Sequence, residues 1–109
     1  MKTSITAAIV AASLGLAGAA HAQITVGFVT SQSGPGSSIG VLYDRGIKAA
    51  AEYAMSVGAE KIKLIQLDDN SDPSTATRNA RKLVEENKVD LLIGTATAAS
   101  TSAMVAVAN

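Results

Sequence analysis

The stretch at residues 24–40 constrains the possible fold most strongly. It begins with a short run rich in β-branched residues, at residues 24–29, and continues directly into a loop rich in glycine, proline and serine. Such a run followed by turn-forming residues predicts a buried strand that ends in a loop. If the next helix returns to a parallel strand, this loop lies at the carboxyl edge of the sheet, where ligands bind in open α/β proteins.

The chain that follows alternates helical and strand patterns. Residues 39–57 have apolar residues at helical spacing, with Ser37 or Ser38 as N-cap and Gly58 placed to end the helix. The later segments are a strand at 61–67, a helix at 73–87, a strand at 89–93 and the beginning of a helix at 98–109. This order predicts a three-layer α/β fold with a parallel sheet and right-handed crossovers. We expect the flavodoxin-like strand order 2-1-3.

The apolar spacing also predicts which helix faces are buried. In the first helix, the residues expected to face the sheet are Leu42, Ala49 or Ala50, Tyr53 and Val57. Gly46 lies on the same face, and because glycine costs about 1 kcal/mol relative to alanine in a helix, it suggests close packing on the sheet. In the second helix, the residues expected to be buried are Ala76, Ala80, Leu83 and Val84.

An acidic turn at residues 68–72 precedes the second helix. Asp72 is expected to be its N-cap and Pro73 its first residue. Oxygen-bearing residues stand at alternate positions, as at the start of a calcium loop, but Pro73 and Asn79 occupy the positions where an EF-hand requires glycine and glutamate. A turn with an N-cap is therefore favoured, and no metal site is assigned.

The N-terminus has the pattern of a secretory signal peptide over residues 1–22. Lys2 provides a positive start, residues 5–16 are apolar, and an A-x-A cleavage site ends at Ala22. The apolar run is shorter than the roughly 20 residues that cross a bilayer. We expect cleavage between Ala22 and Gln23, a periplasmic mature protein, and no stable membrane insertion after cleavage.

Composition excludes several classes of function. The chain has no cysteine, so it offers neither a disulfide scaffold nor a thiolate metal site. Its one histidine, His21, lies in the predicted signal peptide, which leaves no Ser-His or Cys-His nucleophile in residues 23–109. A net charge of zero and three aromatic residues (two Tyr and one Phe) argue against a nucleic-acid partner. We expect no catalytic residues, no cofactor and no metal.

The glycine-rich loop only partly matches a nucleotide-binding turn. Gly34, Gly36 and Gly40 have the spacing G-x-G-x-x-x-G instead of G-x-G-x-x-G, and Pro35 removes a backbone amide. We favour a loop whose amides and hydroxyls hold a small polar ligand at a helix N-terminus, where the helix dipole favours a carboxylate. A plain turn without a ligand is the alternative.

A second loop of small and hydroxyl-bearing residues occupies residues 94–101. Thr97 alone would be enough to cap the helix that follows. The strand order 2-1-3, however, places this loop beside the Ser37-Ser38 loop, across the point where the strand order reverses. Two hydroxyl-bearing loops and two helix N-termini are therefore expected to face one crevice.

These motifs, in this order, resemble the periplasmic substrate-binding proteins of branched-chain amino acid ABC transporters, which have the type I binding-protein fold. The motifs are Ser33-Gly34-Pro35, Ser38-Ile39-Gly40, Gly46, Leu67-Asp68-Asp69, Ser71-Asp72-Pro73, Arg81-Lys82-Leu83-Val84 and Val89-Asp90-Leu91-Leu92-Ile93-Gly94. The resemblance implies a two-lobed clamshell that closes on an amino acid or similar small ligand and delivers it to an inner-membrane ABC permease. Residues 23–109 would be part of its N-terminal lobe.

The resemblance also implies which positions bind the ligand's carboxylate and ammonium groups. They are Ser37, Ser38, Ile39, Ala96, Thr97, Ala98 and Ala99. Ala98 departs from the family pattern, because many members place a hydroxyl residue there. Thr97 or backbone amides would then replace that hydroxyl, or the ligand differs. Family members are several times longer, so the second lobe and the pocket for the ligand's side chain are not expected within these residues.

Two functions of other classes stay open. One is a fragment of a nucleotide-using α/β enzyme, which export and the broken glycine pattern disfavour. The other is a ligand-sensing receptor domain of the same fold without a transporter. Neighbouring genes for a permease and an ATPase would distinguish the transport protein from the receptor.

We predict that the exported protein begins at Gln23, because signal peptidase cleaves after an A-x-A site that follows an apolar run. N-terminal sequencing of protein recovered from the periplasm checks this. An intact Met1 in the soluble fraction would contradict it.

Overall fold

The computed structural model describes residues 23–57 and 61–109. The signal peptide expected at residues 1–22, with Ala22, and the helix end expected at Gly58 lie outside the described residues. The elements are β1 (Ile24–Thr30), α2 (Ser37–Ser56), β2 (Ile62–Asp68), α3 (Pro73–Arg81), the π-helical turn η1 (Lys82–Glu86), β3 (Leu91–Ile93) and α4 (Ala98–Ala108).

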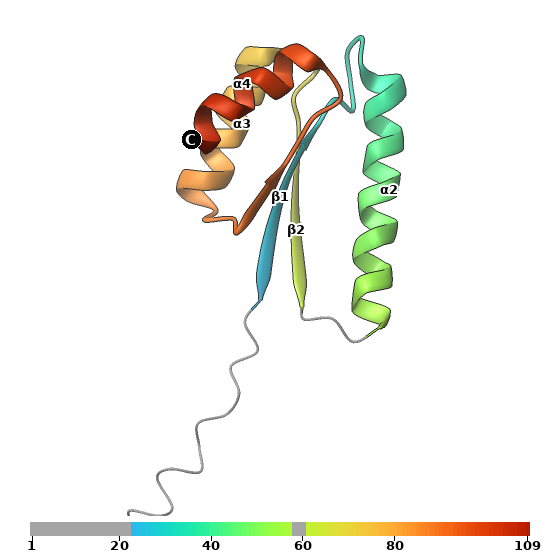
Figure 1. The fold of residues 1–109 in the computed structure, drawn as a ribbon. Helices are drawn as coiled ribbons and strands as arrows, with labels where there is room; N and C mark the ends of the chain where they lie inside the picture. Colours follow the sequence, from blue (N-terminus) through green and yellow to red (C-terminus); the bar gives the residue numbers. More distant parts are fainter. Residues whose placement is uncertain (1–22, 58–60) are drawn as a thin grey trace, which may run out of the picture.

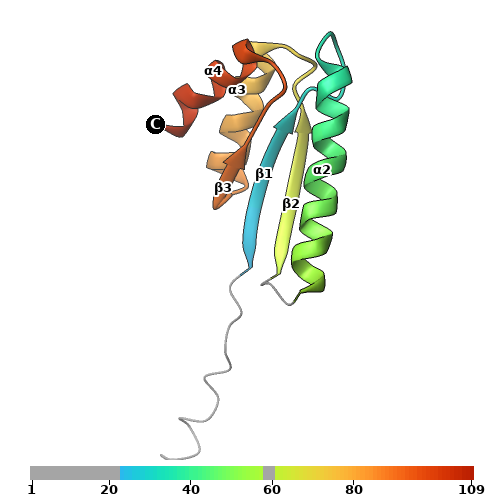
Figure 2. The same cartoon turned by 45° about the vertical axis from the view of Figure 1, so that its right-hand side comes forward.

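The strands form a parallel sheet in the order β2-β1-β3. Val26 of β1 aligns with Leu64 on one side and with Leu91 on the other. Since β2 and β3 flank β1 on opposite sides, right-handed crossovers place the helices that precede them on opposite faces. Figures 1 and 2 show α2 on one face, and α3 and α4 on the other. The predicted α/β fold and strand order are confirmed.

The tightest packing lies on the face covered by α3 and α4. Val29, Ala76, Ala80 and Leu83 are fully buried there, and Met104 is nearly so. The burial predicted for Ala76, Ala80 and Leu83 is confirmed. Val84, also expected to be buried, is only partly buried. The small alanines allow α3 to approach the sheet closely, because they add little side-chain volume between the layers.

The start of α3 also agrees with the sequence prediction. Asp72 is its N-cap, with Pro73 at the first helical position. The carboxylate of Asp72 accepts hydrogen bonds from the backbone N–H of Thr75 at 2.7 Å and from the Thr75 hydroxyl at 2.8 Å.

The predicted buried face of α2 is wrong. Leu42 and Tyr53 are 62% and 70% exposed, and a Cβ added to Gly46 would meet nothing within 4 Å. From Gly40 onward, the buried or half-buried residues of α2 are instead Gly40, Val41, Asp44, Ile47, Ala51 and Ala54. They also recur at helical spacing, so periodicity alone could not choose between the two faces.

One close contact sets the rotation of α2. The Cα of Gly40 lies against the backbone of Ser31, where any Cβ would overlap the Ser31 carbonyl oxygen. The Thr30 hydroxyl also donates a hydrogen bond of 3.1 Å to the Gly40 carbonyl. The closely packed glycine of α2 is therefore Gly40, six residues before Gly46, and it packs against the residue that follows β1.

The expected N-cap of α2 is also corrected. Gly36 is the N-cap, with no side-chain hydrogen bond, and Ser37 and Ser38 lie inside the first turn. The Gly36 carbonyl accepts the N–H groups of Ile39 and Gly40 at 3.1 and 3.0 Å, so the helix begins earlier than the apolar pattern indicates.

β3 is shorter than the strand expected at residues 89–93, because Asp90 pairs with β1 through its side chain. Its carboxylate accepts the Thr25 N–H at 2.8 Å, while its own N–H donates to the Thr25 carbonyl at 2.8 Å. No strand among the described residues pairs with the outer edge of β3. None of the helices in the described segments has the length and apolar content to cross a membrane.

The two helix glycines give a matched test of this packing. We expect Gly40→Ala to lower the free energy of unfolding by about 1–3 kcal/mol, because the new Cβ overlaps the Ser31 backbone. Gly46→Ala should raise it by about 0.5–1 kcal/mol, because alanine is the better helix former in open space. Urea denaturation followed by circular dichroism measures both. Equal stability of the two variants would contradict this packing.

Candidate functional site

Three loops emerge at the same end of the sheet, where the parallel strands end (Figures 1 and 2). Residues 31–36 connect β1 to α2, residues 69–72 connect β2 to α3, and residues 94–97 connect β3 to α4. Ligands of open parallel sheets bind at this edge. The positions predicted from the sequence lie in the third of these loops and in the first turns of α2 and α4.

A buried polar cluster joins the three loops. Asp69 and Ser31 are fully buried, and Thr95 is 8% exposed. The Ser31 hydroxyl donates to Oδ1 of Asp69 at 2.7 Å, and the Thr95 hydroxyl donates to Oδ2. The Ser71 N–H also donates to Oδ1, at 2.8 Å. The sequence prediction missed this cluster, although a polar residue just beyond the end of each apolar strand was a visible signal.

Asp68, at the end of β2, holds the β1 loop from the solvent side. Its Oδ1 accepts the N–H groups of Gln32 at 2.9 Å, Ser33 at 3.3 Å and Asn70 at 2.9 Å, and its Oδ2 accepts the Ser33 hydroxyl at 2.5 Å. Burial by itself raises the pKa of Asp68. The hydrogen bonds from Ser33, Asn70 and Gln32 outweigh it, and the net pKa lies below the ordinary value of 3.8.

The loop after β1 and the loop after β2 also contact each other through backbone groups and the Ser71 hydroxyl. The Ser71 hydroxyl donates to the Ser33 carbonyl at 3.0 Å and accepts the Gly36 N–H at 2.9 Å. A Cβ at Gly34, whose φ is +76°, would overlap the backbone of Asn70. Gly34 therefore serves this close approach between loops, which is a structural reason for part of the glycine pattern.

The acidic turn is engaged with its own neighbours. Asp68, Asp69 and Asp72 each accept hydrogen bonds from nearby backbone N–H or hydroxyl groups. Across the described ranges, no three His, Cys, Asp or Glu side chains are grouped so as to hold a metal ion. The turn therefore organises loops and caps α3.

The structure brings the two predicted ligand loops together. A Cβ at Gly36 would lie 2.9 Å from Cγ2 of Thr97, so the N-terminus of α2 adjoins that of α4. Thr97 caps α4, as the simpler interpretation expected, and its hydroxyl accepts the Ser100 N–H at 3.3 Å. The predicted positions that are half-buried are Ser37, Ala96 and Thr97, and those that are exposed are Ser38, Ile39, Ala98 and Ala99.

The electrostatics of this junction favour an anion. The first N–H groups of a helix have no intrahelical acceptor, and no acidic residue occupies the first turn of α2 or α4. In the described chain, the N–H groups of Ala98 and Ala99 have no backbone or side-chain acceptor. The Thr97 hydroxyl accepts one hydrogen bond and keeps its own proton to donate. These groups could bind one carboxylate.

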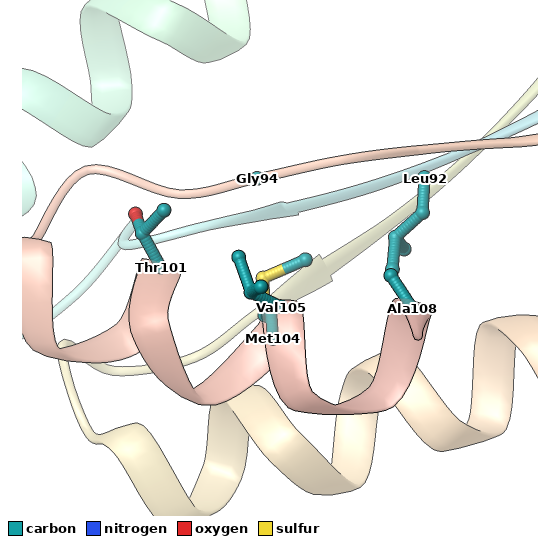
Figure 3. Close-up of a pocket in the computed structure, with 6 residues that line it drawn as sticks. All are labelled: Leu92, Gly94, Thr101, Met104, Val105 and Ala108. Atoms are coloured by element: carbon teal, nitrogen blue, oxygen red, sulfur yellow. The ribbon is translucent and has the colours of Figure 1, made fainter.

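The apolar hollows lie elsewhere, along β3. Figure 3 shows one between β3 and α4, lined by Leu92, Gly94, Thr101, Met104, Val105 and Ala108. Its volume of about 120 Å³ is below the range of roughly 300–1,000 Å³ typical of ligand pockets. A groove on the opposite face is lined by Phe28, Leu42, Tyr43, Gly46, Ile47, Ala50, Ile93 and Gly94. Both adjoin the edge of β3 that has no partner strand among the described residues, and neither is lined by Ser37, Ser38 or Thr97.

The profile of a protein family described as periplasmic binding protein matches residues 23–109. The chain belongs to this periplasmic binding protein family. An amino acid binding protein of Pseudomonas aeruginosa is 33% identical over 96 residues, which cover 85% of this chain and 26% of that protein.

Solved structures agree with this assignment. The substrate-binding protein LivJ of a branched-chain amino acid transporter from Streptococcus pneumoniae, in complex with isoleucine, gives a TM-score of 0.77 at 28% identity, over 80% of this chain and 26% of its own. A solute-binding protein of an ABC transporter from Rhodopseudomonas palustris, in complex with 3,4-dihydroxybenzoic acid, gives a TM-score of 0.69 at 27% identity. The match covers 79% of this chain and 24% of that protein. This periplasmic binding protein chain spans about a quarter of the length of these proteins and forms part of a type I domain.

The lowered pKa of Asp68 predicts a dependence of stability on pH. A carboxyl group whose pKa is lower in the folded state stabilises the fold above its ordinary pKa of 3.8, and this contribution disappears as pH falls through the lower value. We expect Asp68→Asn to lose less free energy of unfolding than the wild type between about pH 5 and pH 2.

Urea titrations at stepped pH measure this difference. Glu52→Gln, which changes an exposed carboxylate of α2, is the matched control and should follow the wild type. Parallel pH profiles for Asp68→Asn and the wild type would show that the hydrogen bonds to Asp68 do not favour its charged form.

Proposed function

We propose that residues 23–109 form part of the N-terminal lobe of an extracytoplasmic solute-binding protein that captures an amino acid or related small carboxylate for import by an ABC transporter. The observation that carries this proposal is the junction of two helix N-termini at the carboxyl edge of the sheet, with Thr97 beside Gly36. Membership of the periplasmic binding protein family supports it. A non-enzymatic role also agrees with the solute-binding relatives.

The proposed site recognises the end of the ligand that different solutes share. The Streptococcus pneumoniae protein binds isoleucine, and the Rhodopseudomonas palustris protein binds 3,4-dihydroxybenzoic acid. The two ligands differ in the rest of the molecule, but each carries a carboxyl group. We assign that group to the Thr97 hydroxyl and to the first-turn amides of Ser38, Ala98 and Ala99. Ser37, Ile39 and Ala96 complete the wall around it.

Ala98 bears on the choice of ligand. It provides a backbone amide but no hydroxyl, so the Thr97 hydroxyl is proposed to take the place of the missing one. The position of Thr97 at the N-cap suits this role, because its oxygen is already held by the Ser100 N–H and its proton stays available. The part of the ligand beyond its carboxyl group would then be selected by groups outside residues 23–109.

The incomplete sheet supports the proposal that these residues are one part of a larger lobe. Among the described residues the outer edge of β3 has no partner strand, and apolar hollows lie on both faces beside it. An open parallel-sheet edge flanked by apolar surface is normally covered by further elements. Residues 1–22 are proposed to be the signal peptide that directs the protein to the periplasm, where an inner-membrane permease would receive the ligand.

We expect residues 23–109 alone to bind no amino acid with micromolar affinity. Hydrogen bonds exposed to water contribute about 0.5–1.5 kcal/mol each, and the entropy lost on association offsets much of that. Joined to the rest of Streptococcus pneumoniae LivJ in place of its matching segment, the same residues should bind isoleucine. Calorimetry with leucine, isoleucine, valine, and aromatic and amide ligands measures both cases.

Variants of this hybrid protein test the assigned group. Thr97→Val should weaken isoleucine binding by about tenfold, because it removes one hydrogen bond to a charged group. Thr77→Val is the matched control, since it makes the same change in α3, where the hydroxyl donates to the Pro73 carbonyl, and it should leave the affinity unchanged. Micromolar binding by residues 23–109 alone, or no binding by a folded hybrid, would contradict the proposed function.

A further inference from the structure

We infer that Asp69 is a positioning residue that sets the spacing between the two helix N-termini of the proposed ligand site. The inference rests on the proposed function and adds to it a residue that does not face the ligand. Asp69 is fully buried, in the middle loop of the three, between loops that carry the proposed binding groups.

The carboxyl group of Asp69 accepts hydrogen bonds from all three loops. Its carboxyl group receives the Ser31 hydroxyl from the loop after β1 and the Thr95 hydroxyl from the loop after β3. The Ser71 N–H holds the same group within its own loop at 2.8 Å, and the Asp69 N–H donates to the Thr30 carbonyl at 3.1 Å. One short side chain therefore links the ends of all three strands.

Both partners of Asp69 are coupled directly to the helices of the site. Ser31 lies against Gly40, the fourth residue of α2, where no Cβ could fit between them. Thr95 stands two residues before Thr97, the N-cap of α4, and its carbonyl accepts the Thr101 hydroxyl at 3.5 Å. A displacement of either hydroxyl from Asp69 would therefore move one helix N-terminus relative to the other.

The energetics favour positioning over simple stabilisation. A buried carboxyl group must have hydrogen-bond partners, because an unsatisfied one is costly. Well-packed apolar residues of the same volume hold buried elements together as well as or better than polar ones do. What the hydroxyl-carboxyl arrangement adds is a single permitted separation, because hydrogen bonds require defined lengths and angles. That separation matters where two loops must reach the same small ligand.

The test uses changes at Thr95, because replacing Asp69 itself could prevent folding. In the hybrid protein with LivJ, Thr95→Val removes the hydroxyl while keeping the shape, and we expect isoleucine affinity to fall by about tenfold. Thr95→Ser keeps the hydroxyl and should retain the wild-type affinity. Asp72→Ala, in the loop that contains Asp69, removes the cap of α3, so it should lower the melting temperature by several degrees without weakening binding.

A second measurement does not depend on ligand binding. In ¹⁵N NMR spectra of the chain itself, Thr95→Val should shift the amide signals of Ser38, Ala98 and Ala99, whereas Asp72→Ala should leave them in place. If Asp72→Ala weakens binding as much as Thr95→Val does, or if folded Thr95→Val binds normally, Asp69 has only a structural role. If the unmutated hybrid does not bind isoleucine, the proposed function fails, and the amide shifts alone decide the positioning of the helices.

Discussion

The central place of β1 is the constraint on which the rest of the structure depends. β1 pairs with β2 along its whole length on one side and with β3 on the other, all in parallel. Parallel pairing brings the three carboxyl ends to one edge, and the reversal of strand order places α2 and α3 on opposite faces. The loops that follow β1 and β3 are thereby neighbours, although more than 60 residues separate the hydroxyls of Ser31 and Thr95.

The carboxyl edge of the sheet and its lateral edge at β3 are built differently. At the carboxyl edge, hydrogen bonds to Asp68 and Asp69 hold the loops in place, so the proposed ligand would not have to order them. Along β3, by contrast, apolar surface is left partly exposed on both faces among the described residues. The ordered edge suits ligand recognition, and the apolar surface suits packing against further polypeptide.

Much of the fold follows from local sequence signals. Strand-forming runs, the N-cap at Asp72 and the alternation of elements predicted the strand order and the positions of the elements, with β3 shorter than expected. The sequence also placed the two ligand loops side by side, and Thr97 next to Gly36 confirms their proximity. The binding roles of the residues in these loops stay a proposal.

What the sequence by itself determined is the order, type and connection of the elements, because these depend on residues close together in the chain. The rotation of α2 was decided by tertiary structure, because apolar residues occupy more than one of its sides and only the contact of Gly40 with Ser31 selects which side faces the sheet. The cluster around Asp69 was decided in the same way. Its hydrogen bonds join residues 26 and 38 positions apart, and no local pattern specifies which buried hydroxyls will meet a given carboxyl group.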